Sequence, residues 1–279
     1  MAQRKSFKIS DEQIRQMYLE GNSLNDIAKV AQDTKGLMAL RQKLIDLGVD
    51  TTKNMKRYRS KMSKACKKYK LKEDIFDCID SDEKAYWLGW YMTDGYNHQS
   101  KCCVALRLQE EDKEILEKLK TFLETDAPIY TFKRGEHKYV ELNICSPHLS
   151  DSLAKLGVIQ CKVHNKSIPN IDDKFIRSFL RGYFDGDGCV SIIPRKDRGA
   201  DSKTYQVTFT GNKEPIAFIE NKLREELGLN VRKINPQHKS YSIHYSGKII
   251  CTKILNWLYK DATVYLQRKY NKYKNIVSR

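Results

Sequence analysis

The chain has 279 residues, a length typical of roughly two domains, and 40% of them are hydrophobic, which is enough for a substantial core. Its net charge is +16, and no apolar run approaches the length of a membrane span. We therefore expect no membrane segment and no secretory signal, and a location in the cytoplasm or on the nucleoid, with an organelle left open. A basic protein of this size is most simply interpreted as a binder of a polyanion, and nucleic acid is the commonest one.

The first 50 residues are expected to form a small all-α module. Ser10 and Ser23 are good N-caps for two short helices, and Gly21 interrupts the chain between them. A third helix is expected at about 35–47, where leucines recur at helical spacing. Three short helices around a glycine turn are typical of a helix-turn-helix, although a small helical bundle without DNA contact has the same pattern.

Segment 18–28 resembles the helix-turn-helix of resolvases and transposases. The resemblance implies that the third helix enters the major groove, with Lys35 and Arg41 as candidate DNA contacts.

Residues 51–72 form a separate basic stretch, with ten Lys and Arg and no Asp or Glu. Like charges at this density repel, so we expect a linker rather than a packed element. Along DNA each cation could displace a counterion, which would make binding depend steeply on salt. A solvated tether without DNA contact is the alternative. The candidate phosphate contacts are Lys56, Arg57, Arg59 and Lys61.

Beyond residue 73 the chain repeats itself. Segments 85–95 and 179–188 both contain an apolar helical run with a central glycine, followed by an acid and another glycine. After each segment come strand-like sequence, an amphipathic helix (111–123 and 215–227) and more strand. Such a long repeat is a half-domain folded twice.

The glycines and acids of the repeat suggest a paired-helix site. Gly89 and Gly182 would let two helices approach closely, which compensates for their cost within a helix. We expect Gly95 and Gly188 to end those helices in the left-handed conformation. The acids then lie at the carboxyl ends of the helices, where the helix dipole disfavours an anion and where two carboxylates repel each other.

Divalent cations between Asp94 and Asp187 would offset both costs, and oxygen ligands suit magnesium. The alternatives are that Asp-Gly is only a common turn signal, or that 185–188 is part of a calcium loop, although the other ligands of an EF-hand are missing.

The two segments resemble the signature of LAGLIDADG homing endonucleases in the single-chain, two-repeat form, over about residues 80–275. The second copy is close to the family pattern, whereas the first departs from it at Trp87, Trp90, Met92 and Thr93. The resemblance implies a mixed fold, α+β (α/β). Its core would be a pseudo-twofold, duplicated αββαββα unit with saddle-shaped antiparallel sheets, and the helix-turn-helix domain would be separate from that core. The expected repeats are 73–170 and 171–279.

The resemblance also implies the chemistry. Asp94 and Asp187 would bind the catalytic metals, Mg²⁺ or a similar divalent ion, and Thr93 and Gly186 would offer backbone carbonyls. Lys166 and Lys269 occupy similar places near the end of each repeat and would be the catalytic lysines, although a solvated surface role is the alternative. The implied reaction is hydrolysis of both DNA strands, leaving short 3′ overhangs.

Alternation of polar and apolar residues predicts strands at 138–144, 206–210 and 240–245, with one face free to lie on DNA. Basic residues in or beside the strands are the candidate DNA contacts: Arg107, Lys133, Arg134, Arg195, Arg198, Lys203, Arg232, Lys233 and Lys239. Together they predict a basic sheet surface.

These observations favour a free-standing monomeric homing endonuclease, encoded by a mobile genetic element, that cuts a long asymmetric DNA target. We expect it to be free-standing because neither the first nor the last residues show an intein-like junction. A DNA-binding transcriptional regulator with a decayed core is an alternative, against which the retention of both acids argues. An RNA-splicing maturase is a third, so RNA stays open as a partner.

The eight cysteines add no site to this hypothesis. They include no Cys-x-x-Cys pair, and no histidine pair completes a zinc pattern. Without a secretory signal, we expect reduced thiols that mostly fill the core.

Overall fold

A computed structural model describes residues 7–32, 37–49, 68–159, 168–195, 203–238 and 240–278. The chain divides into two compact units, Met1–Ala65 and Cys66–Arg279. Within the described residues no helix has the length and apolar character needed to cross a membrane.

The first unit contains three short helices: α1 (Asp11–Leu19), α2 (Leu24–Val30) and α3 (Leu37–Asp46). Ser10 and Ser23 cap α1 and α2, and each forms a reciprocal capping box with the third residue of its helix, as expected. Ile14, Ile27 and Leu40 are fully buried where the helices meet. The three-helix prediction is therefore confirmed, and the contact of this unit with DNA stays a prediction.

The second unit contains two similar series of elements. The first series is α5 (Asp82–Thr93), β1 (Gly95–His98), β2 (Cys103–Gln109), α6 (Lys113–Phe122), β3 (Ile129–Arg134), β4 (His137–Cys145) and α7 (Pro147–Lys155), with short 3-10 turns η2 (Gln99–Lys101) and η3 (Glu110–Asp112). The second is α8 (Asp173–Asp187), β5 (Cys189–Pro194), β6 (Lys203–Gly211), α9 (Lys213–Leu227), β7 (Asn235–Gln237), β8 (Ser240–Ser246), α10 (Lys248–Tyr259) and α11 (Gln267–Val277).

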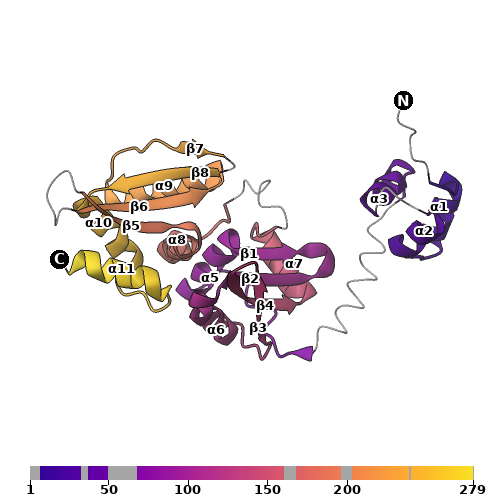
Figure 1. Ribbon diagram of the computed structural model, residues 1–279, viewed down its shortest axis with the longest axis horizontal. Coiled ribbons are helices and arrows are strands. Elements are labelled where there is room, and N and C mark those ends of the chain that lie inside the picture. The colour runs from indigo at the N-terminus through magenta and orange to yellow at the C-terminus, as the bar shows by residue number, and fades with distance from the viewer. Residues whose placement is uncertain are drawn as a thin grey trace. The chain divides into compact units, whose positions relative to one another are not determined.

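Each series builds one four-stranded antiparallel sheet, with strand orders β1-β2-β4-β3 and β5-β6-β8-β7 (Figure 1). The two orders are equivalent, so the repeat in the sequence is also a repeat of structure. Helices α6 and α7 contact the first sheet, and α9 and α10 contact the second. The predicted mixed α/β fold with duplicated antiparallel sheets is confirmed.

The predicted strands all fall within observed ones, because alternation places every second side chain in the core. Helix α9 begins at Lys213, so Pro215 lies in its first turn.

The two motif helices α5 and α8 pack against each other between the sheets (Figure 1). A Cβ on Gly89 would lie 2.5 Å from the backbone nitrogen of Tyr183, and one on Gly182 would overlap the backbone carbonyl of Tyr86. The predicted reason for these glycines is therefore confirmed: only a missing side chain allows the two backbones to come this close.

Two predictions about the repeat were wrong. Gly188 has φ −84° and ψ 163°, and neither it nor Gly95 has a positive φ, because a strand begins directly after each helix. These glycines are needed for space instead: a Cβ on Gly188 would lie 2.5 Å from the carbonyl oxygen of Phe184, and a Cβ on Gly95 would meet the backbone of Tyr91.

The cysteine prediction was also wrong at one pair. Cys103 and Cys145 lie opposite each other on β2 and β4 and form a disulfide, because the strand register brings their Cα atoms to 4.1 Å. Among the other described cysteines, Cys102 and Cys251 are buried and form no disulfide, as expected.

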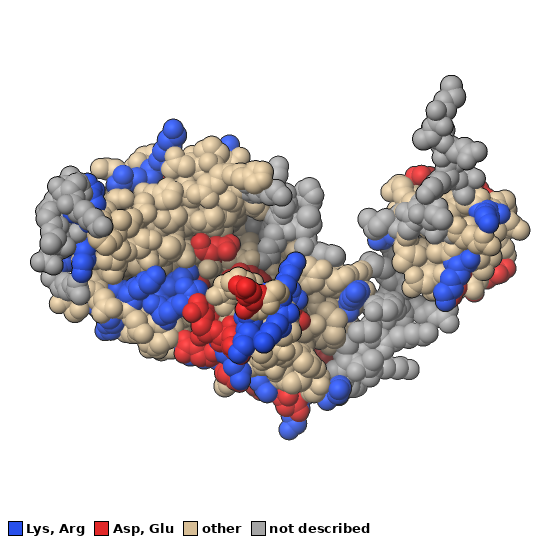
Figure 2. Space-filling model, in the orientation of Figure 1, with Lys and Arg blue, Asp and Glu red and all other residues tan. Residues whose placement is uncertain are grey.

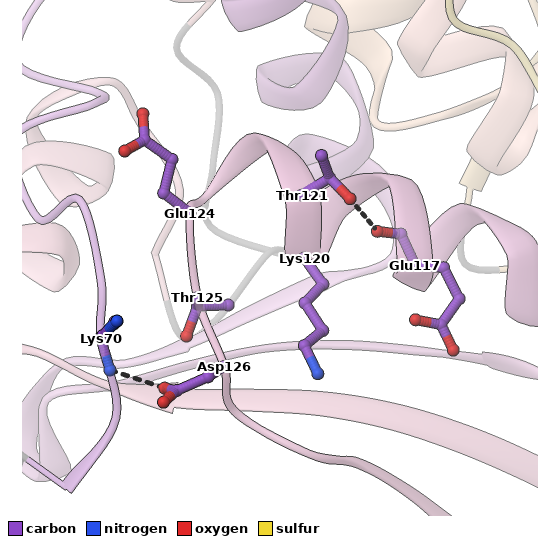
Figure 3. A pocket seen from close by; sticks show the side chains of 7 residues that line it. All are labelled: Lys70, Glu117, Lys120, Thr121, Glu124, Thr125 and Asp126. Atoms are coloured by element: carbon purple, nitrogen blue, oxygen red, sulfur yellow. Dashed lines mark hydrogen bonds between the residues drawn. The ribbon is translucent and has the colours of Figure 1, made fainter.

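The end of the basic stretch is part of the second unit. The backbone nitrogen of Lys70 donates to Asp126 at 2.6 Å, and the ammonium of Lys72 contacts Glu124 at 3.0 Å. Tyr69 and Leu71 pack against the core. Figure 3 shows the resulting groove, which Lys70, Glu117, Lys120, Thr121, Glu124, Thr125 and Asp126 line.

Candidate active site at the ends of the paired helices

The two motif carboxylates are both exposed. Asp94 is the C-cap of α5 and Asp187 is the last residue of α8. Neither is buried in an apolar pocket, so a ligand from solvent can reach both.

The ends of α5 and α8 lie against each other. Thr93 fills the space that a Cβ on Gly186 would need, and one Asp94 carboxylate oxygen lies 3.2 Å from that Cβ position. Asp187 lines a small cavity together with Met92 and Thr93 from α5. Tyr183, Gly211, Asn212 and Pro215 complete the lining of this cavity. The structure thus brings the neighbourhoods of both predicted metal ligands together.

The donor set fits a hard divalent cation. Carboxylate oxygens, here from two adjoining helix ends, are ligands that hard divalent cations prefer. Within the described residues no group of three or more His, Cys, Asp or Glu is placed to hold a metal ion. The Thr93 hydroxyl donates to the Trp90 carbonyl of its own helix at 3.0 Å.

Lys269 of α11 lies directly behind the end of α8. It is 3% exposed, and its ammonium donates to the carbonyls of Phe184 (2.6 Å), Asp185 (2.8 Å), Gly186 (3.3 Å) and Gly188 (2.6 Å). The carbonyls of Asp185 and Gly186 belong to the last turn of α8, which leaves its carbonyls without helical partners, whereas the Phe184 carbonyl also accepts from the Gly188 backbone nitrogen at 2.9 Å. Lys269 therefore caps α8 with a positive charge, which counteracts the negative end of the helix dipole beneath Asp187.

Burial lowers the pKa of Lys269 to about 8, and the negative charges of Asp185 and Asp94 oppose that shift. Asp94 belongs to the first repeat and Lys269 to the second, so the lysine lies within electrostatic range of both motifs.

Asp185 is a buried acid beside this site that the sequence analysis did not single out. It is fully buried, and its carboxylate accepts hydrogen bonds from the Tyr86 hydroxyl (2.8 Å), the Tyr259 hydroxyl and the Leu266 backbone nitrogen (2.9 Å). Burial raises the pKa of Asp185, whereas Lys269 and the three donors favour its ionised form. Its position two residues before Asp187, on the opposite side of the helix, was the one available signal.

A third buried charge, Arg181, completes this cluster. Its guanidinium donates to the carbonyls of Val264 (3.0 Å) and Leu258 (3.3 Å) and lies 5.3 Å from the centroid of the Tyr86 ring. Burial lowers the pKa of Arg181, and the charge of Asp185 opposes that shift.

The outer face of the first sheet carries charged and aromatic side chains. Arg107 contacts Glu141 at 2.6 Å on the neighbouring strand and lies over the ring of Phe132. Its charge is therefore partly neutralised within the protein. Lys133 and Arg134 are exposed at the tip of the β3–β4 hairpin.

The outer face of the second sheet differs from the predicted basic surface. The register gives this face neutral polar side chains along β6 and β8: Thr204, Gln206, Thr208, Thr210, Ser240, Ser242, His244 and Ser246. His244 lies in a hydrogen-bonded row, with Thr208 at 3.0 Å on one side and Ser242 at 2.9 Å on the other. Hydroxyl, amide and imidazole groups can read base edges, whereas cations mainly position phosphates.

Among the predicted cations of the second repeat that the structure describes, Arg195 reaches this face, since its guanidinium donates to the Thr204 hydroxyl at 3.5 Å, and the others lie around it. Arg195 and Lys203 are at the paired ends of β5 and β6, and Lys233 is exposed in the loop before β7. Arg232 packs its guanidinium over the buried Tyr245 ring, with its backbone nitrogen bound to Glu220. On the face drawn in Figure 2, acidic side chains gather near the middle of the second unit, with basic side chains on both sides.

Arg41 is half-buried on α3. The predicted catalytic Lys166 lies outside the described residues, and so do the remaining predicted DNA contacts: Lys35, Lys56, Arg57, Arg59, Lys61, Arg198 and Lys239.

Comparison with known proteins gives a match to the second repeat. A family model described as "LAGLIDADG-like domain" matches residues 174–252, which run from the start of α8 into α10. A curated relative, reverse gyrase of Methanocaldococcus jannaschii, is 26% identical over 188 residues, and the match covers 65% of this chain and 10% of that protein.

Among solved structures, I-SmaMI bound to an uncleaved DNA target with calcium ions is 14% identical, with a TM-score of 0.48. The match covers 70% of this chain and 89% of the I-SmaMI chain. The I-LtrWI LAGLIDADG homing endonuclease bound to target DNA is 10% identical, with a TM-score of 0.48, and covers 73% and 90%.

Proposed function

We propose that this chain, which contains a LAGLIDADG-like domain, is a site-specific endonuclease that hydrolyses both strands of double-stranded DNA. The observation that carries the proposal is the pair of exposed carboxylates, Asp94 and Asp187, at the adjoining ends of two structurally repeated helices.

Asp94 and Asp187 would hold divalent metal ions, with the carbonyls of Thr93 and Gly186 beside them. Such ions, when bound, polarise a phosphate, lower the pKa of a water molecule and stabilise the leaving oxygen. Lys269 keeps the end of α8 in place and offsets its negative dipole, so the carboxylate beside it is presented in one orientation. Lys166 is proposed for the corresponding role in the first repeat.

The outer faces of the two sheets would lie on the DNA. The neutral polar face around His244 would read base edges, while the cations at the strand ends would position phosphates. Because the first sheet presents aromatic and charged residues instead, the two halves would recognise different sequences. A single chain of this kind needs a long asymmetric target and can act as a monomer, cutting both strands to leave short 3′ overhangs.

The first unit and the basic stretch would extend this footprint. Part of the binding energy would come from counterion release along the phosphate backbone, and the helix-turn-helix unit would add contacts in the major groove.

The experiment is cleavage of a randomised plasmid library with Mg²⁺, followed by sequencing of the cut ends. We expect one family of target sequences, cut on both strands with short 3′ overhangs, and no cleavage in EDTA or by an Asp94→Asn, Asp187→Asn double variant. If the wild-type protein enriches particular sequences by binding but cuts none of them, the nuclease proposal is wrong and a DNA-binding regulator replaces it.

A further inference from the structure

The buried carboxylate of Asp185 has no place in the proposed metal chemistry, because it is fully buried and its partners all come from inside the protein. We propose that Asp185 is a positioning residue: it joins both repeats to the end of α8 and so fixes the orientation of Asp187. This inference rests on the proposed nuclease function and deepens it.

Asp185 receives hydrogen bonds from three separate elements. Tyr86 comes from α5 of the first repeat, Tyr259 from the end of α10, and the Leu266 backbone nitrogen from the segment that leads into α11. A carboxylate with three fixed donors cannot rotate without breaking at least one of these bonds. The last turn of α8 is thus tied to the first repeat and to the C-terminal helices at a single point.

The connection continues from Asp185 to Asp187 through Lys269. The ammonium of Lys269 spans Asp187, since it binds the carbonyl of Gly186 before it and the carbonyl of Gly188 after it. A buried ammonium needs a nearby negative charge, and Asp185 is the buried carboxylate of this cluster. Loss of the Asp185 charge would therefore loosen the lysine and the backbone around Asp187 together.

The segment that carries Lys269 is itself held by the first repeat. Arg268 forms a two-pronged contact with Asp112, with nitrogen–oxygen distances of 2.8 and 3.0 Å, and the backbone nitrogen of Gln267 binds Glu114 at 3.0 Å. Bidentate pairs of this kind fix direction as well as distance. Lys269 therefore approaches α8 from a fixed position.

This arrangement exists at only one of the two motif helices. The residues that match Asp185 and Tyr86 in the other motif are Met92 and Phe179, which cannot form such a bond. The support is thus specific to Asp187, and its loss should affect the two DNA strands unequally.

The test uses three variants of the full chain: Asp185→Asn, the milder Tyr86→Phe, and Ser150→Ala as a control. Ser150 donates a buried hydrogen bond to Asn97 in the first repeat, away from the motif ends, so its variant loses stability without touching α8. Hydrogen–deuterium exchange is measured without DNA or metal on peptides covering 183–190. Cleavage of the recovered target is measured separately for each labelled strand.

We expect faster exchange at 183–190 in both Asp185→Asn and Tyr86→Phe, and a strand-cleavage ratio that changes by about 10- to 100-fold in Asp185→Asn, because a displacement of about 1 Å costs roughly 100-fold in rate. The Ser150→Ala protein should keep the wild-type ratio and the wild-type exchange in this segment.

Unchanged exchange at 183–190 in both variants would overturn the proposal, and so would an equal loss of cleavage on both strands, which a general loss of folded protein produces. If the wild-type protein cuts no DNA, the nuclease function fails, and the exchange result alone then decides whether Asp185 positions the end of α8.

Discussion

Asp94 and Asp187 lie where a negative charge is unfavourable for the fold, at the carboxyl ends of adjoining helices. Replacement of either by Asn should therefore raise stability, by up to about 1 kcal/mol at low salt, while cleavage is lost. Urea unfolding and a cleavage assay on the same samples measure both effects. A variant that is destabilised and inactive would indicate a structural role for the carboxylate instead.

Replacement of Lys269 should instead lower the stability of the protein. Lys269→Met keeps the aliphatic bulk but removes the donor to four carbonyls and leaves Arg181 as the buried cation near the Asp185 charge. We expect a loss of about 3 kcal/mol or more, as is typical when one member of a buried charge pair is removed, together with loss of cleavage. Urea unfolding tests this, and a fully stable Met variant would contradict the capping role.

The candidate ligands could be predicted from the sequence because an acid followed by glycine occurs twice in equivalent places. Asp185 could not, since its partners come from positions as far away as Tyr86 and Leu266, and the sequence does not show which loops cover a helix. The resemblance indicated Lys269, but not that it is buried among backbone carbonyls.

At the scale of elements, the paired helices depend on two glycines. In an isolated helix Gly182→Ala would be favourable by about 0.5–1 kcal/mol, but here the new methyl group would overlap the Tyr86 backbone, which cannot move aside like a flexible side chain. We expect this overpacking to lower the free energy of unfolding by about 3 kcal/mol or more.

Gly228→Ala is the matched control for this prediction. Gly228 has φ +57° and nothing within 4 Å of its would-be Cβ, so only the backbone strain of about 1–2 kcal/mol remains. Thermal unfolding of both proteins compares the two costs. A Gly182→Ala protein as stable as the control would contradict the close approach of α5 and α8.

Helices and strands were predictable wherever apolar spacing was regular, as in β4 and α9. The conformation of Gly95 and Gly188 was not, because a glycine after a helix serves equally for a left-handed turn and for close packing, and the difference depends on where the next strand begins. The neutral outer face of the second sheet was missed for a related reason: the sequence shows cations near the strands, and only the register shows which face they occupy.

At the scale of the whole molecule, the charge is concentrated in residues 51–72, whereas Tyr69 and Leu71 pack against the second unit. Removal of residues 1–67 should therefore leave the second unit folded but weaken DNA binding. The slope of the logarithm of the DNA-binding constant against the logarithm of the salt concentration should become less steep by about 0.9 for each phosphate that the shortened chain no longer neutralises. Binding titrations at several salt concentrations test this. An unchanged slope would show that the basic stretch is only a tether.

The most direct measurement is anomalous scattering from Mn²⁺ in crystals of the full chain bound to its recovered DNA target. We predict anomalous peaks between the carboxylates of Asp94 and Asp187 and the phosphates to be cut, and their loss in the Asp94→Asn, Asp187→Asn double variant. Peaks that lie elsewhere, or that persist in the double variant, would contradict the assignment of these two residues as the metal ligands.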